Sequence, residues 1–387
     1  MPSPKRPLRY HAGHRNATWL ELFFDLVFVV VVGKVTHLLA HEHHHHLEPG
    51  LWWKFPLMLL PVWWIWMLHT AWSNLYDTDG KPHRLASLFV MLQMVVLSTV
   101  MVSDWEGAYP LFNASYFGLR LTFAVLYLTH GNGHDGFESF GRERGFGILI
   151  AALVSLSSAL WDAPLRYGIF YLGVALDLLH PILMRRAKKI PALHLDHFVE
   201  RMGLLIIILL GESVISLSSG LSDVEWNGDT ITASLTGAVL IGATWWIYFD
   251  RYHLLARAGV GGARDGLTLG YPHFLTCLGL SIMANTIFHA IHPGLDRHEY
   301  ALMGLAGMAI FFLGKQVPYY ARFAMVRGNI LINTGITLSL SIAATFLPDN
   351  VSILIGLTVA LLVYVALNYF HVIPKLRASL EGGVEAG

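Results

Sequence analysis

Twelve apolar runs dominate the chain, and most are close to the roughly 20 residues that an α-helix needs to cross a bilayer. Short polar connections separate the runs, so little sequence remains for a water-soluble domain. The pattern predicts an all-α integral membrane helix bundle of about twelve spans. The fourth run is the shortest and contains Arg120. The runs cover residues 18–39, 51–72, 85–102, 117–128, 145–161, 167–184, 199–219, 231–248, 273–291, 301–319, 330–346 and 351–370.

Similar segments recur 191 residues apart, which indicates an internal repeat. Residues 174–187 (VALDLLHPILMRRA) match residues 365–378 (VALNYFHVIPKLRA) at the opening Val-Ala-Leu, at a histidine, at one isoleucine and at the closing Arg-Ala. We therefore expect one membrane domain made of two six-helix halves, residues 1–190 and 191–387. Because six is an even number of crossings, both halves enter the membrane in the same direction, and the repeat is parallel.

Positive charges are distributed unevenly among the connections. Nineteen of the Lys and Arg residues lie at the two termini and in alternate connections, whereas the opposite connections hold only Arg166 and Arg297. Since cytoplasmic connections are enriched in Lys and Arg, both termini are predicted to lie in the cytoplasm. Removing any one span would invert the side of every later connection, so this asymmetry favours twelve.

The composition agrees with a membrane setting, because 55% of the 387 residues are hydrophobic and only 13% are charged, about half the charge of a soluble domain. A formal net charge of +0 argues against a nucleic-acid partner. Cys277 is the single cysteine, which excludes an internal disulfide and a thiolate metal cluster. The predicted partners are the lipid bilayer and a small solute or ion that the sequence does not identify.

The first apolar run carries ionisable residues at membrane depth, where each costs about 2.5–3.5 kcal/mol even on the mildest scale. Glu21 and Asp25 are four residues apart and share a helical face. They either point into a functional interior or sit at the helix entrance, where they complement the positive end of the helix dipole. Lys34 lies deeper and needs a partner. The repeat places it opposite Glu212, which predicts a buried ion pair that either joins the two halves or binds a proton or an anion.

Two further groups of charges fall within or beside the predicted spans. Arg120 is expected to pair with Asp177, and binding of an anion is the alternative. Glu200 and Arg201 begin the seventh span, where they either gate access to a pathway and bind an anionic group or form a local salt-bridge cluster. Together with the four residues above, these are the candidates for a transport pathway or for buried structural charges.

A histidine-rich segment follows the first span and provides the weak candidates for a metal site, His41, His43, His44, His45 and His46. Clustered imidazoles can bind Zn²⁺, Ni²⁺ or Cu²⁺, but an ordered site needs fixed geometry, which a mobile loop does not provide. The chain has no Walker loop, HExxH motif or GxSxG nucleophile elbow. We therefore predict no cofactor and assign no catalytic residue.

Several motifs occur in the order found in the bacterial low temperature requirement A family, and the chain resembles that family over nearly its whole length. The resemblance implies a polytopic bacterial membrane protein, located in the inner (plasma) membrane. The family name refers to growth in the cold, and no agreed molecular activity comes with it. The motifs are residues 17–28 (ATWLELFFDLVF), 63–66 (WWIW), 76–79 (YDTD), 91–94 (MLQM), 200–204 (ERMGL), 210–213 (LGES) and 245–250 (WWIYFD), followed by His273.

The sequence is compatible with three functions. A secondary transporter or permease for a small polar or ionic solute, coupled to protons, is favoured by the parallel repeat and the buried charges. A structural or sensory membrane protein that supports growth in the cold is the main alternative. A membrane-embedded enzyme that uses the same carboxylates as acid and base is less favoured, since the sequence shows no nucleophile or metal cage.

Overall fold

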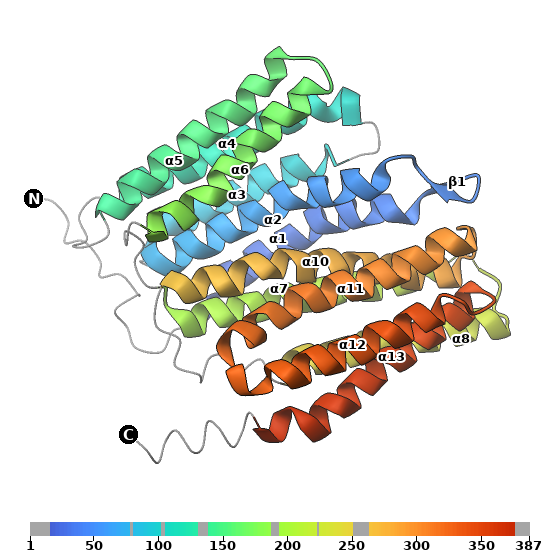
Figure 1. Cartoon of the computed structure of the whole chain (residues 1–387). Helices are drawn as coiled ribbons and strands as arrows, with labels where there is room; N and C mark the ends of the chain where they lie inside the picture. Colours follow the sequence, from blue (N-terminus) through green and yellow to red (C-terminus); the bar gives the residue numbers. More distant parts are fainter. Residues whose placement is uncertain are drawn as a thin grey trace, which may run out of the picture. The chain divides into compact units, whose positions relative to one another are not determined.

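A computed structural model describes residues 16–77, 80–101, 105–130, 138–186, 193–222, 224–250 and 263–375. The fold is all-α, as predicted, and the described residues contain twelve helices of 18 or more residues (Figure 1). The helices are α1 (Trp19–Thr36), α2 (Leu51–Tyr76), α3 (Lys81–Ser98), α4 (Trp105–His130), α5 (Glu138–Ser157), α6 (Leu165–Arg186), α7 (Leu195–Gly220), α8 (Gly228–Phe249), α10 (Ala263–Ile291), α11 (Arg297–Arg322), α12 (Arg327–Ala344) and α13 (Asn350–His371).

Ten of these helices are long and apolar enough to cross a membrane, among the residues that the structure describes. The other two, α3 and α12, have the length but more polar side chains. The protein is thus a multi-pass membrane protein.

The fourth helix is much longer than its apolar run, and this corrects the predicted boundary. Helix α4 has 26 residues, and one face of its first half, which includes Asn113, is buried. The Asn113 side chain donates to the Ser158 hydroxyl at 3.1 Å and to the Leu156 carbonyl at 3.3 Å. A hydropathy pattern excludes such a residue from a span, whereas a neighbouring helix can satisfy its hydrogen bonds.

The described chain forms two compact units. The first contains the described residues of Met1–Val35, Leu57–Arg201 and Gly261–Leu267. The second contains those of Thr36–Pro56, Met202–Val260 and Thr268–Gly387.

In the first unit, α4, α5 and α6 pack side by side (Figure 1). Helices α5 and α6 approach closely at Gly173, where an added Cβ would lie 2.5 Å from the Ala151 carbonyl oxygen. Ser155 of α5 donates to the Phe170 carbonyl of α6 at 3.0 Å. This tight α5–α6 interface brings Asp177, one turn after Gly173, within reach of cations on the neighbouring helices.

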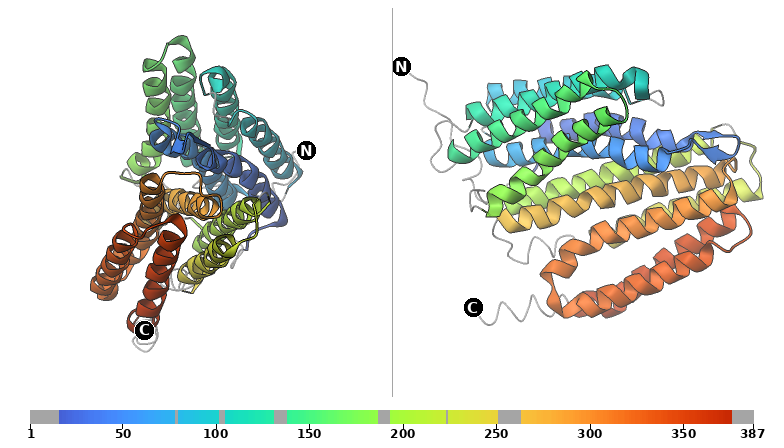
Figure 2. Two further views of the ribbon diagram at one scale, coloured as in Figure 1. Left: turned by 90° about the vertical axis from the view of Figure 1, so that its right-hand side faces the viewer. Right: turned by 45° about the horizontal axis from the view of Figure 1, so that its top comes forward.

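In the second unit, α12 and α13 lie side by side, in orange and red in Figure 2. Helices α10 and α11 approach closely at Gly279, where an added Cβ would lie 2.6 Å from the Phe311 Cα. The histidine-rich segment forms a hairpin of two short antiparallel strands, β1 (Glu42–His43) and β2 (His46–Leu47).

Aspartate side chains begin two helices of the second unit. Asp296 accepts hydrogen bonds from the first backbone N–H groups of α11. Asp349 accepts from the Ser352 backbone N–H and from the Ser352 hydroxyl, both at 2.8 Å. These bonds hold the pKa of the Asp349 carboxyl below its ordinary value. Because such caps satisfy helix N–H groups that have no partner within the helix, they define where α11 and α13 start.

Replacing Asp349 by Ala should lower stability by about 1 kcal/mol, whereas Asp349→Asn should remain close to wild type because Asn also caps helices well. The folded-state pKa is lowered, so the ionised cap contributes fully above the ordinary carboxylate pKa and its contribution disappears as the pH falls through the folded value. Thermal unfolding in detergent should therefore separate wild type from Asp349→Ala at pH 7 and bring them together well below about pH 4. An equal gap at both pH values would contradict this role.

Candidate functional site

The two acids of α1 are buried in the first unit, with side chains on the same face of the helix. Glu21 and Asp25 are 1% and 3% exposed. Burial at this level leaves the carboxylates dependent on partners within the protein. Both carboxylates are buried, while Glu21 also lies at the start of α1, where its side chain accepts from a backbone N–H.

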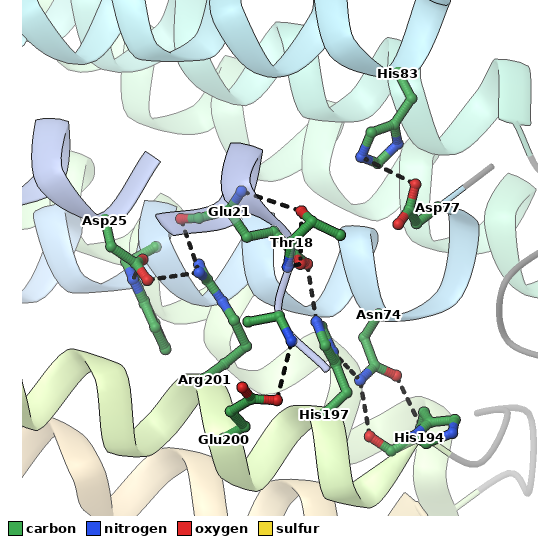
Figure 3. Close-up of polar contacts among 12 residues, drawn as sticks. Thr18, Glu21, Asp25, Asn74, Asp77, His83, His194, His197, Glu200 and Arg201 are labelled. Carbon is green, nitrogen blue, oxygen red and sulfur yellow. Dashed lines mark hydrogen bonds and ion pairs between the residues drawn. The ribbon is translucent and has the colours of Figure 1, made fainter. Parts of the chain in front are cut away.

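Their partners are two residues of α7, also four positions apart. His197 Nε2 lies 2.9 Å from Glu21 Oε1, and Arg201 Nη1 donates to Asp25 Oδ2 at 2.6 Å (Figure 3). Both partners are fully buried. Each contact joins residues 176 positions apart, so the first turns of α7 run in the same direction as α1.

Helix α2 completes this network. The indole N–H of Trp66 donates to Asp25 Oδ1 at 2.9 Å, and the Arg201 guanidinium lies over the Trp66 ring at 5.4 Å. The Asn74 amide lies 2.9 Å from His197 Nδ1 and accepts from the His194 backbone N–H at 2.8 Å. Each buried charge therefore has a partner from another helix, which low-dielectric surroundings require.

Glu21 has a second task at the start of α1. Its Oε2 accepts from the Thr18 backbone N–H at 2.8 Å, while the Thr18 hydroxyl accepts from the Glu21 N–H at 3.2 Å. This reciprocal pair is a capping box. Glu200 accepts from the Ala17 N–H at 2.9 Å, just before the helix. Glu200 and Arg201 thus serve different partners, one stabilising the entry to α1 and the other binding Asp25.

Sequence reasoning missed Thr18, Trp66 and Asn74. The Thr18–Glu21 spacing is a capping-box signature, and this signal could have identified Thr18. Trp66 lies in the motif of residues 63–66, but no local pattern indicates which side chain it contacts. Asn74 has no sequence signal, because its partners lie 120 or more positions away.

A second charge cluster joins α4, α5 and α6. Arg120 lies 3.1 Å from Asp177 Oδ2, and Arg144 lies 2.8 Å from Asp177 Oδ1. Arg120 also donates to the Ser155 hydroxyl at 2.9 Å and to the Gly173 carbonyl at 3.2 Å. The predicted Arg120–Asp177 pair is confirmed, with Arg144 as an additional partner. One buried carboxylate thus holds two guanidinium groups.

In the second unit, Glu212 is buried at 4% exposure and its carboxylate lies 3.6 Å from His37 Nε2. The Lys34 side chain is exposed, so the prediction of a buried Lys34 that pairs with Glu212 is wrong. The repeat alignment identifies equivalent positions in two halves, and equivalent positions need not touch. His37, which continues α1 in a short 3-10 helix (His37–Ala40), meets the acid instead.

The histidine-rich hairpin is held by hydrogen bonds within the second unit. The Asp296 N–H donates to the His45 carbonyl at 2.7 Å, and His46 Nδ1 lies 2.9 Å from Glu299. Burial raises the pKa of the Glu42 carboxyl, and His45 and His292 oppose that shift. Among the described residues, no group of three or more His, Cys, Asp and Glu side chains is arranged to hold a metal ion.

A cavity of about 760 Å³ opens in the second unit near the starts of α8, α11 and α13. Its charged lining includes Asp349, which caps α13, and Arg297, which donates to the carbonyls of Thr345 and Leu347 at 2.9 Å. These charges serve the helix ends, in contrast to the acid–base pairs of α1 and α7.

Long apolar helices with internally paired charges define a polytopic membrane helix bundle. The chain belongs to the bacterial low temperature requirement A (LtrA) family, whose profile matches residues 16–367. It is also 27% identical over 393 residues to an uncharacterized protein of Rhizobium meliloti (strain 1021), covering 92% of this chain and 91% of that relative. The resemblance that the motifs indicated is thus confirmed.

Asp177→Asn should be strongly destabilising, because it leaves two buried guanidinium groups without a counter-charge. Removing one partner of a buried ion pair costs about 3–5 kcal/mol. Asp162→Asn is the matched control, since that acid is fully exposed and its contact with Arg166 is long, at 3.8 Å. Thermal unfolding and size-exclusion profiles in detergent would measure both variants, and a loss below about 1 kcal/mol for Asp177→Asn would contradict a tightly coupled cluster.

Proposed function

We propose that this protein is a proton-coupled secondary transporter of a small polar or ionic solute, with the Glu21–His197 and Asp25–Arg201 pairs as the coupling site. One observation carries the proposal: two acids of one membrane helix each meet a different basic side chain of another, at 2.9 and 2.6 Å, with all four buried. Ionisable residues at membrane depth commonly mark proton relays and substrate pathways.

The Asp25–Arg201 pair has two neutral alternatives that a transporter can exchange. In one, the carboxylate neutralises the guanidinium directly. In the other, Asp25 carries a proton and Arg201 is neutralised by an anionic solute. Because either state avoids an uncompensated charge in lipid, the exchange costs far less than exposing one charge alone. The pair can therefore link proton binding to solute binding.

The second unit contains an acid–base contact of its own. There α7 supplies the acid Glu212, and the segment that follows α1 supplies the base His37. Ionisable groups at membrane depth are the kind of group that proton relays use, so this contact adds support for a proton-coupled function.

The direction of the helices supports twelve crossings in two parallel halves. Helices α1 and α7 run the same way at their first turns, so the helices between them must cross the membrane an odd number of times. Five crossings, α2 to α6, satisfy this condition, and four do not. The more polar α3 is therefore proposed to be a span, and α12 is proposed to be the span that brings the second half to six.

Solid-supported-membrane electrophysiology on proteoliposomes would test transport directly. A panel of anions, cations and neutral metabolites at two pH values should include a solute that evokes a current in wild type. Asp25→Asn should abolish this current because a fixed neutral side chain cannot alternate between charge states, and Asp162→Asn should retain it. A current that persists in folded Asp25→Asn would remove Asp25 from coupling. Silence across the panel, with pH-dye assays also negative, would favour the structural or sensory alternative.

Reporter fusions would test the proposed topology. A cytoplasmic reporter should be active at the C-terminus, and a periplasmic reporter should be active after Thr99, between α3 and α4, because α3 would carry the chain outward. Fusions after Tyr76 provide the control of opposite sign. A cytoplasmic signal after Thr99 would exclude α3 as a span and with it the parallel repeat.

A further inference from the structure

The guanidinium of Arg201 uses Nη1 for its contacts within the protein. The edge formed by Nε and Nη2, called the vacant edge below, has no partner among the described residues. Nη1 donates to Asp25 and to the Glu21 carbonyl, at 2.6 and 2.9 Å. Nε and Nη2 have no hydrogen-bond partner among the residues that the structure describes, although the side chain is fully buried. These two N–H groups point in the same direction along one side of the guanidinium plane, which is the geometry that binds a carboxylate or phosphate through two parallel hydrogen bonds.

Unpartnered donors on a buried charge are unusual. Buried polar groups are almost always hydrogen-bonded, and an exception calls for an ion, a water molecule or a functional role. Packing does not remove the cost, because the nearest aromatic face, that of Trp66 at 5.4 Å, offers no hydrogen-bond acceptor in the plane of the guanidinium. The vacant edge of Arg201 is thus a binding feature without a protein ligand.

His69 supplies a second unpartnered polar group in the same unit. Within the described part of the chain, neither of its ring nitrogens has a hydrogen-bond partner, and the side chain is 1% exposed. The ring stacks on Phe24 with centroids 3.7 Å apart and planes 9° apart, and it lies within the electrostatic influence of Arg201 and Glu21. Phe24 precedes Asp25 in α1, and His69 follows Trp66 by three positions in α2, so His69 belongs to the same helix turns as the partners of Arg201.

We propose that the vacant edge of Arg201, with an N–H of His69 beside it, binds a small oxyanion such as a carboxylate or phosphate. This assignment of a substrate class rests on the proposed transport function, although binding can be tested without transport. The groups facing Asp25 are Arg201, Glu21 and Trp66, with His69 at the side. As the anion takes over Arg201, Asp25 loses its counter-charge and accepts a proton from water. One negative charge and one proton enter together, and the site stays neutral.

Binding should be measured on the purified full-length protein by isothermal titration calorimetry and thermal shift. Acetate, phosphate and sulfate are the probes, and methylammonium chloride is the cation control. Saturable binding of at least one oxyanion, tighter at lower pH and accompanied by proton uptake in weakly buffered solution, is the expected result. The acetate and phosphate arms identify the kind of oxyanion. Absence of saturable binding by all three anions would overturn the inference.

Two variants separate a binding role from a structural one. His69→Phe keeps the stacked ring but removes both nitrogens, so it should fold at least as stably as wild type, since an unsatisfied polar group is lost. It should nevertheless weaken anion binding by about tenfold, the loss expected for one hydrogen bond to a charged ligand. Arg201→Lys keeps the charge but not the two-pronged edge and should weaken binding further, while Asp162→Asn should bind as wild type does.

Unchanged anion affinity in His69→Phe would remove that ring from the site, and unchanged affinity in folded Arg201→Lys would overturn the oxyanion assignment. The outcomes also separate this inference from the proposed function. Currents evoked only by cations, without anion binding, would leave transport standing and reject the oxyanion. Anion binding without flux would leave the oxyanion site standing and reject the proposed transport function.

Discussion

The arrangement of this protein depends on one constraint: a charge placed among apolar helices must be neutralised by another part of the same chain. The Asp25–Arg201 contact meets this constraint at 2.6 Å, and Trp66 occupies the remaining carboxylate oxygen. The same solution recurs where Asp177 holds two arginines. Pairs of this kind determine which helices must be neighbours, since a helix that drifted away would leave a bare charge behind.

Much of the fold could be predicted, because the dominant forces leave a local signal. Apolar runs of the right length locate helices, and all twelve predicted segments coincide with helices after adjustment of their boundaries. The largest adjustment was at α4, whose first half contains Asn113 and its hydrogen bonds to the neighbouring segment. Hydropathy describes each residue against lipid, whereas Asn113 never meets lipid. The same reasoning explains why α3 and α12 are helices of full length without a strongly apolar composition.

The candidate site was predictable in part, and there is a physical reason why some of its residues could be identified and others could not. Buried acids are visible in a sequence because they interrupt an apolar pattern, so Glu21 and Asp25 could be identified. Their partners were harder to identify, since a contact between residues 176 positions apart leaves no periodicity. The Lys34–Glu212 pairing failed because internal symmetry relates equivalent positions but does not measure distance. His37, one turn further along, was within reach of the acid instead.

The double use of Glu21 has a mechanical consequence. One carboxylate oxygen begins helix α1 through Thr18, and the other binds His197. A proton that settles on this carboxyl removes the negative charge that strengthens both bonds. The charge of Glu21 is therefore coupled to the stability of the first helical turn. Protonation of this one carboxyl group therefore acts on the geometry of the segment that leads the chain into the bilayer.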